Sequence, residues 1–402
     1  MSKHSTLFIK NPCVWYLGAW CLYYLQGTLY SVGSPLSRIL VFSLIAVSLY
    51  HAVLLFSTPG KPLFFNGLNA IVIMYTFYGL LLLLTDGLAT HGTQMTVNSL
   101  DYLKSYYMTL LPIYSCYYYT RNGYLTKKIY SYFAVAFVVV GVFSFYRMQR
   151  EMIEYFALNG ENREEVINNS GYVLLSIIPA LIVLYKRPIL QYVCIGICLV
   201  FVLLSMKRGA ILCAMVFLLA FIWHKMKNTK GSRKLAVIMI IGISLYLLVG
   251  LVEKELSTSD FFVARIEQTL EGNTSGREAM FASYFSYYIN DAGIIHELVG
   301  HGANGTVKIL GEYAHNDWLE LLINQGLLGI IIFIFYLYGF WKATRRRSIH
   351  IESRFALTTI FLIFFIQTFF SGGITNSIIF SSSMMGFALA DGFREDSINI
   401  QQ

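Results

Sequence analysis

The sequence predicts an all-α, polytopic membrane protein with about twelve transmembrane helices, and three observations lead to that class. Of the 402 residues, 56% are hydrophobic and only 13% are charged, whereas a soluble domain carries roughly 25% charged residues. Apolar runs that approach the roughly 20 residues needed to cross a bilayer recur along the whole chain. Aromatic residues reach 16%, and many lie near the ends of these runs, as is typical of membrane interfaces.

The expected spans are the charge-poor runs, taken in chain order. They cover residues 13–30, 36–56, 68–85, 100–119, 129–146, 171–185, 189–206, 209–224, 235–252, 326–341, 355–370 and 374–391. The first run is too long for a cleaved signal peptide and has no small-residue cleavage site, so we interpret it as a membrane span. Without internal repeats or an appended soluble region, residues 1–402 are predicted to form a single integral membrane domain.

The charge distribution predicts how the chain is oriented. Twelve spans place both termini on one side, and the short loops on that side, such as residues 225–234 and 342–354, are basic. The positive-inside rule then places both termini of this inner-membrane protein in the cytoplasm. The net charge of +8 comes from these separate clusters, which argues against a nucleic-acid-binding face.

One outer connection is much longer than the others. Residues 253–325, between the ninth and tenth spans, carry eleven acidic and four basic side chains. Connections of this length are usually functional, so we expect the chemistry in this periplasmic loop. Phe281, Tyr284, Phe285 and Tyr288 recur at helical spacing, which predicts a short helix with an aromatic face on the membrane surface or against the spans.

The sequence offers little for a metal or a disulfide. All six cysteines lie in predicted spans and none in the long loop, so neither a disulfide framework nor a zinc site is expected. His and carboxylate residues show no convincing ligand spacing. The glycine-rich residues 300–305 match no phosphate-binding loop and are predicted to form a turn.

Three cations lie where the local rules disfavour them. Lys207 and Arg208 occupy a tight outer turn that should be poor in charge, which suggests a function; the alternative is snorkelling to the interface. Arg277 lies in the first turn of a predicted helix, where a cation opposes the helix dipole. The alternative for Arg277 is a surface ion pair with Glu278 or Asp291.

His315 precedes a long helix. Asp317 and Glu320 have capping-box spacing, so a helix should begin near Asn316 or Asp317. His315 then lies just outside the positive end of that helix, which favours a neutral imidazole that can accept a proton. A lone histidine is more often structural than catalytic, and a hydrogen bond to a loop carbonyl is the alternative role.

Several of these motifs together resemble a known family. Ser-Gly-Arg at residues 275–277, Gly-x-Gly at 300–302 and His-Asn-x-x-Leu-Glu beginning at His315 resemble the signature of the O-antigen ligase and polymerase superfamily. Lys-Arg-Gly-Ala at 207–210 is similar to the short basic motif of that family at the outer end of a span. Their order and membrane side together are more specific than any single motif.

The resemblance implies a metal-independent, inverting glycosyltransferase of the GT-C type without a cofactor. Such proteins move a glycan from undecaprenyl diphosphate to an acceptor sugar: polymerases join repeat units, and ligases attach O-antigen to the lipid A core. The resemblance implies that Arg208 and Arg277 hold the diphosphate and that His315 lies near the acceptor hydroxyl. Four residues of the same motifs are expected to contact substrate: Lys207, Asn316, Asp317 and Glu320.

Several functional readings remain open. We favour a repeat-unit polymerase, with the ligase as the alternative. The expected partners are the lipid-linked donor, a glycan or lipid A-core acceptor, membrane lipid and a chain-length regulator protein. A transporter that flips lipid-linked oligosaccharides also suits twelve spans, but its ionisable residues should lie at mid-membrane. A structural or sensor membrane protein is the third class.

Overall fold

The computed structural model describes residues 10–86, 99–159, 166–229, 277–372, 374 and 380–393, together with seven isolated positions between 231 and 267. Within these segments the regular structure is helical, and an isolated bridge joins Gln26 to Tyr30. The predicted all-α class is therefore confirmed for the described part of the chain.

Five of the described helices are long and apolar enough to cross a membrane: α3 (Pro35–Phe56), α4 (Phe64–Asp86), α7 (Lys127–Leu158), α10 (Arg208–Asn228) and α16 (Asp317–Thr344). Two shorter apolar stretches are α8 (Ser170–Ile177) with the 3₁₀ helix η1 (Ile178–Lys186), and α9 (Pro188–Leu204). The other described helices are α2 (Pro12–Tyr24), α5 (Ser99–Leu110), α6 (Pro112–Arg121), α13 (Arg277–Asn290), α14 (Gly293–Val299), α15 (Gly305–Leu310), α17 (Ile351–Gln367) and α18 (Ser381–Leu389).

The helix boundaries differ from the predicted spans in several places, so the count of twelve stays a prediction. The expected span 100–119 consists of α5 and α6, because Pro112 begins a new helix where its missing N–H costs no hydrogen bond. The expected span 13–30 is helical only as far as Tyr24. Helix α7 continues to Leu158, beyond the predicted end. The expected span 235–252 lies almost wholly outside the described residues.

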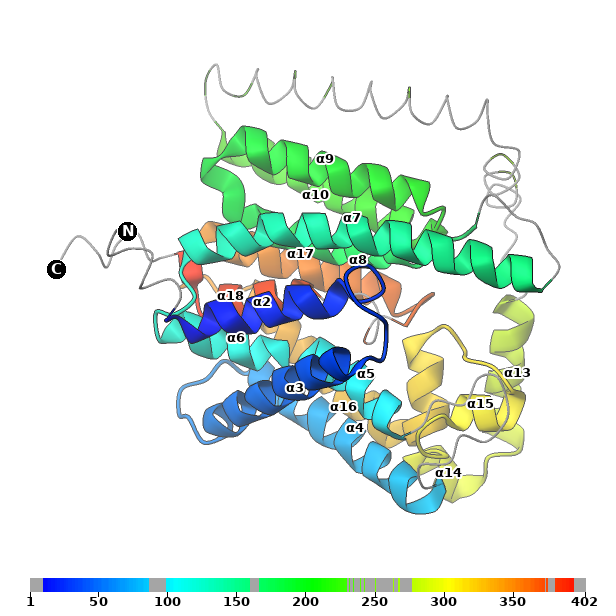
Figure 1. The fold of residues 1–402 in the computed structure, drawn as a ribbon. Coiled ribbons are helices and arrows are strands. Elements are labelled where there is room, and N and C mark those ends of the chain that lie inside the picture. Colours follow the sequence, from blue (N-terminus) through cyan, green and yellow to red (C-terminus); the bar gives the residue numbers. More distant parts are fainter. Residues whose placement is uncertain are drawn as a thin grey trace.

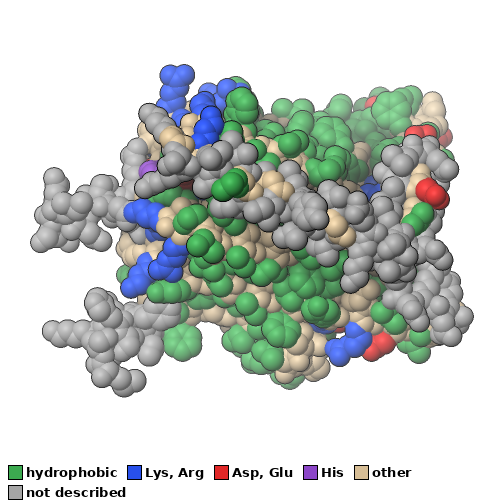
Figure 2. All heavy atoms as spheres, turned by 90° about the horizontal axis from the view of Figure 1, so that it is seen from above, with side chains coloured by type: hydrophobic (Ala, Val, Ile, Leu, Met, Phe, Trp, Pro, Cys, Tyr) green, Lys and Arg blue, Asp and Glu red, His purple; other side chains and the backbone are tan. Residues whose placement is uncertain are grey.

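The short helices of the long loop gather at one end of the helix bundle (Figure 1). Helices α13, α14 and α15 lie together there, so short helices are present in the described part of the loop, residues 277–325. On the face shown in Figure 2, most Lys and Arg side chains lie toward the opposite end, and a broad hydrophobic band separates them from acidic side chains. This distribution agrees with the positive-inside rule for a membrane-spanning bundle.

Helix α13 forms where the aromatic repeat predicts it, but its aromatic residues do not share one environment. Tyr284 is fully buried against Ala314 and Ile323, and its hydroxyl donates a hydrogen bond to the Glu312 carbonyl at 2.5 Å. Phe285 is 54% exposed. The helix is therefore anchored to the start of α16 through Tyr284, while Phe285 points away from this contact.

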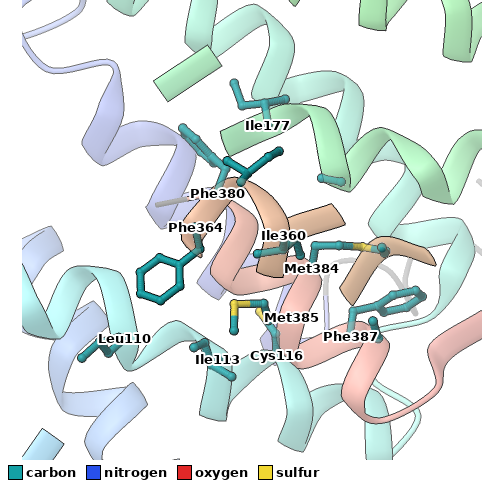
Figure 3. Packing of buried hydrophobic residues seen from close by; sticks show 14 of the residues in the cluster. Leu110, Ile113, Cys116, Ile177, Ile360, Phe364, Phe380, Met384, Met385 and Phe387 are labelled. Atoms are coloured by element: carbon teal, nitrogen blue, oxygen red, sulfur yellow. The ribbon is translucent and has the colours of Figure 1, made fainter. Parts of the chain in front are cut away.

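The helices approach one another most closely where a small residue faces a neighbouring backbone. A Cβ added to Gly386 of α18 would lie 2.5 Å from the Ile113 carbonyl oxygen of α6. Such small residues let membrane helices pack tightly although lipid is as apolar as their side chains. Figure 3 shows the packing between these two helices, with Met385 of α18 beside Cys116 of α6. Helices α6 and α18 are therefore in close backbone contact.

Candidate functional site

Helix α16 begins at the predicted place but with a different cap. Asn316 has an extended backbone (φ −148°, ψ 115°), and its side chain accepts hydrogen bonds from the N–H groups of Trp318 at 2.9 Å and Leu319 at 3.2 Å. Asp317 is therefore already inside the helix. The predicted capping box of Asp317 and Glu320 is wrong, because the amide one residue earlier occupies the capping position.

Residues 368–370, directly after α17, accept hydrogen bonds from three residues of the candidate site through their backbone carbonyl groups. The Asn316 amide and the Asp317 N–H donate to two of its carbonyl oxygens, at 3.0 and 2.9 Å. Arg277, the first residue of α13, donates through Nη1 to a third, that of Phe370, at 2.9 Å. The start of α16 and Arg277 therefore share one anchor, although they are far apart in sequence.

His315 lies immediately before this cap in the left-handed backbone region, with φ of 50°. Burial lowers its pKa below the ordinary value, and the charges of Arg277 and Lys207 lower it further, while Glu312 opposes them. The predicted preference for a neutral imidazole therefore agrees with the structure. Its causes are burial and two neighbouring cations, whereas the sequence argument relied on the helix end.

Lys207 reaches this region because α10 starts against two aromatic rings. A Cβ added to Gly209 would lie 2.4 Å from the Tyr172 hydroxyl and 2.5 Å from the Phe370 ring, so only glycine allows this approach. The Lys207 ammonium lies 5.8 Å from the centre of the Tyr172 ring. Phe370 therefore has two roles. Its carbonyl oxygen accepts the hydrogen bond from Arg277, and its ring packs against Gly209 at the start of α10.

The structure therefore brings together three of the residues singled out in the sequence: Lys207, Arg277 and His315. Arg208 is the first residue of α10 and follows Lys207 directly. Its convergence with Arg277 on one anion stays a prediction, as does the substrate contact assigned to each residue of these motifs.

The Glu320 carboxylate forms hydrogen bonds that link the long loop to α16. Its carboxylate accepts hydrogen bonds from the Ala314 N–H at 2.6 Å, the Thr306 hydroxyl at 2.8 Å and the Asn324 amide at 3.0 Å. Three donors around one carboxylate fix the loop against the first turns of α16.

The predicted turn at residues 300–305 is a docking element for α16. Gly326 has φ of 63° and ψ of −160°, which breaks the helical hydrogen bonding inside α16. The N–H groups of His301 and Gly302 donate at 2.9 Å each to the carbonyl oxygens of residues 323 and 324, which that break leaves available. A Cβ added to Gly300 would lie 2.3 Å from the Asn324 backbone. The turn at residues 300–302 therefore supplies hydrogen bonds to carbonyl groups at the kink of α16.

A cavity of about 470 Å³ adjoins His315. One wall consists of the first turns of α16, including Asp317 and Glu320. Asp317 also accepts a hydrogen bond from the Ile374 N–H at 3.2 Å. The lining also includes residues from the N-terminal half of the chain, among them Tyr75, Tyr102, Tyr106 and Arg147.

These N-terminal residues were not among the site residues predicted from the sequence. Tyr102 and Tyr106 are one turn apart on α5, and Arg147 is a cation at the outer end of an expected span. Such features are common in membrane proteins, and they indicate a site here only because the folded structure brings these residues to one cavity. Among the described residues, no three His, Cys, Asp or Glu side chains are grouped so that they could hold a metal ion. The expectation of a metal-independent reaction stays a prediction.

This fold and site define the class of a polytopic helical membrane protein with a polar site at one end of its bundle. Residues 193–334 match the family described as O-Antigen ligase, so the resemblance to the O-antigen ligase and polymerase superfamily is confirmed. The matched part contains α10, the docking turn and the first half of α16. No curated protein matches the chain significantly.

Proposed function

We propose that this protein transfers a glycan from undecaprenyl diphosphate to a sugar hydroxyl at the periplasmic face of the bacterial inner membrane, as a repeat-unit polymerase. The family match supports ligase- or polymerase-type chemistry. The observation that carries the proposal is the position of His315, whose pKa Arg277 and Lys207 lower, beside a polar and aromatic cavity.

The proposed reaction is a direct displacement. The acceptor hydroxyl oxygen attacks the anomeric carbon of the donor sugar, and the bond from that carbon to the diphosphate oxygen breaks. Undecaprenyl diphosphate leaves with the bonding electrons, and the configuration at the anomeric carbon inverts. The hydroxyl proton passes to neutral His315, which later releases it to water. A positioned base of this kind contributes about 10²–10⁴-fold to the rate.

The cations stabilise the leaving group in this proposal. Negative charge grows on the diphosphate as the glycosidic bond breaks, and a guanidinium can hold two phosphate oxygens at once. The hydrogen bond to the Phe370 carbonyl orients Arg277 before substrate binds. Lys207 and Arg208, at the start of α10, supply further positive charge. Losing one preorganised donor of this kind costs about 3–4 kcal/mol of transition-state stabilisation.

The ligase is the second candidate, because the matching family is described as O-Antigen ligase. A strain lacking the gene separates the two functions on a polysaccharide gel. A polymerase is indicated when the ladder disappears and a single attached repeat unit remains. A ligase is indicated when all attached glycan is lost and lipid-linked polymer accumulates. An unchanged polysaccharide profile would contradict both.

The role of Arg277 gives a direct test. In a transfer assay with purified protein and lipid-linked donor, Arg277→Lys should lower the rate by about 10²–10³-fold, because an ammonium lacks the planar fork. Arg345→Lys is the matched control, since Arg345 lies at the far end of α16 and should retain full activity. Wild-type transfer by Arg277→Ala at normal protein levels would remove Arg277 from the site.

A further inference from the structure

The cavity beside His315 has one aromatic wall. The Tyr75 and Tyr106 rings stack with centres 3.5 Å apart and planes 15° from parallel, and Tyr102 meets Tyr106 edge-on at 4.9 Å. The Gln325 amide of α16 donates to the Tyr102 hydroxyl at 3.3 Å, which joins this cluster to the opposite wall. Rigid aromatic faces with a few fixed polar groups are typical of small-molecule sites.

The α16 wall of the same cavity is rich in hydrogen-bond acceptors. Asp317 and Glu320 contribute carboxylates, and Asn324 contributes an amide. Glu320 and Asn324 are held by the bonds that brace the loop. Their geometry is therefore set before any ligand binds. Such groups suit the hydroxyls of a sugar, but they repel an anion.

Arg147 provides a buried cation in the cavity lining. Its side chain is only 13% exposed. Its Cδ lies under Gly27, where an added Cβ would be 2.4 Å away, and Nη1 donates to the Gln26 carbonyl at 2.5 Å. Among the described residues its buried Nε has no hydrogen-bond partner, and the Glu151 carboxylate is 3.6 Å from that nitrogen.

Lys104, the other cation in the cavity lining, differs from Arg147. Its ammonium lies 2.5 Å from the Asp101 carboxylate, and both side chains are about half exposed. A buried charge that water solvates poorly is costly, and an anion bound in the cavity beside the Arg147 guanidinium would add to the distant Glu151 carboxylate in offsetting that cost. Arg147 is therefore the cation in this lining that an incoming anion would stabilise most.

We infer that this cavity binds a glycan unit that carries an anionic group, a carboxylate or a phosphate. Arg147 pairs with the anion, the tyrosine wall contacts the sugar ring, and the α16 wall accepts its hydroxyls. Because the acidic wall repels the anion, the sugar is oriented with its charged group toward Arg147 and its hydroxyls toward α16 and His315. This inference rests on the proposed function, since it names the class of acceptor.

The alternative is that Arg147 only ties the backbone near Gln26 to α7. Arg147→Gln separates the two roles, because it removes the charge and is too short to reach the Gln26 carbonyl: loss of the anion contact abolishes the preference for acidic ligands, whereas loss of the backbone tie lowers thermal stability without changing that preference. Arg150→Gln is the matched control: Arg150 lies one turn further along α7, its side chain is 65% exposed, and it also contacts this backbone, at Gly27, with 3.4 Å between donor and acceptor.

The test measures binding to the full-length protein in lipid nanodiscs by calorimetry. The probes are three oligosaccharides of equal length, containing a uronic acid, a phosphorylated hexose or only neutral sugars. Wild type and Arg150→Gln should bind at least one acidic probe about tenfold or more tightly than the neutral one. In Arg147→Gln this preference should disappear, while binding of the neutral probe is retained. Whichever acidic probe binds more tightly identifies the anion.

Equal binding of all three probes by wild type would overturn the inference, as would a preference that survives in Arg147→Gln. These results leave the proposed function intact, because transfer to a neutral acceptor would still be possible. Conversely, selective binding that depends on Arg147, without any transfer activity, would overturn the proposed function alone.

Discussion

At the scale of single residues, the conformation of His315 stands out. A non-glycine residue in the left-handed region costs roughly 1–3 kcal/mol when the surroundings enforce it. Here the fixed neighbour is Asn316, which caps α16 and bonds to the segment after α17 at the same time. The strain therefore has an identifiable cause, and its result is an imidazole at the cavity beside two cations.

The electrostatics of His315 predict a pH profile. In the proposed reaction its neutral form accepts a proton, so transfer should fall as the pH drops through its pKa, which is held below the ordinary value of about 6.5. Lys207→Gln removes one of the charges that lower this pKa, so the acidic limb of the rate profile should move to higher pH. His315→Gln should reduce the rate by about 10²–10⁴-fold near neutral pH and should remove the acidic limb.

Initial rates between about pH 5 and pH 8 check this prediction, since this is the range in which histidine titrates. Lys342→Gln, near the other end of α16, is the control and should leave the profile in place. If the acidic limb of Lys207→Gln coincides with that of wild type, Lys207 does not act on the base. Wild-type transfer by His315→Gln would remove the base assignment, and Asp317 would be tested next.

At the scale of elements, α16 works as two helices joined at Gly326. The first part carries Asn316, Asp317 and Glu320 and is held by the long loop. The second part crosses the bundle beside α4. The break at Gly326 frees carbonyl groups for the turn at residues 300–302, so one glycine couples the loop to the bundle.

Substitution of Gly326 tests this coupling. Gly326→Ala places a Cβ 2.5 Å from the Leu298 carbonyl carbon and forces a left-handed backbone on alanine. We expect it to cost at least about 1–3 kcal/mol and to lower the melting temperature of the purified protein. Gly196→Ala on α9 is the control, because its Cβ would meet open space and helix propensity favours alanine by up to about 1 kcal/mol. Equal melting temperatures for the two variants would contradict the docking role.

At the scale of the whole molecule, the candidate site and the basic loops belong to opposite ends of the bundle. The proposed function needs the site end in the periplasm, where a lipid-linked sugar can reach His315 while its tail stays in the bilayer. The charge distribution in the sequence favours this orientation.

Cysteine labelling in intact cells checks the orientation. Glu312 and Ser348 are both exposed, whereas all six native cysteines are buried, so an introduced cysteine should dominate the signal. A membrane-impermeant maleimide should label Glu312→Cys and not Ser348→Cys, and both should label once the membrane is permeabilised. The reverse pattern would place His315 and Arg277 in the cytoplasm and end the enzyme proposal.

Four features could be predicted from the sequence: the all-α membrane class, the start of α16, the helix at α13 and the motif residues around His315. Apolar length, cap-forming residues and helical spacing are local properties, so they can be read from neighbouring residues. The identity of the cap was missed, because Asn316 and Asp317 are equally good candidates until the backbone is seen.

The contacts between residues far apart in the sequence could not be predicted in this way. Phe370 joins Arg277 to the start of α10, and Tyr75 and Arg147 face α16 across a cavity, although these residues come from separate helices. Such contacts depend on how whole helices pack, and packing in a membrane is governed by shape and small residues more than by the apolar pattern along the chain. That pattern predicts which segments lie in the bilayer but not which helices pack against one another.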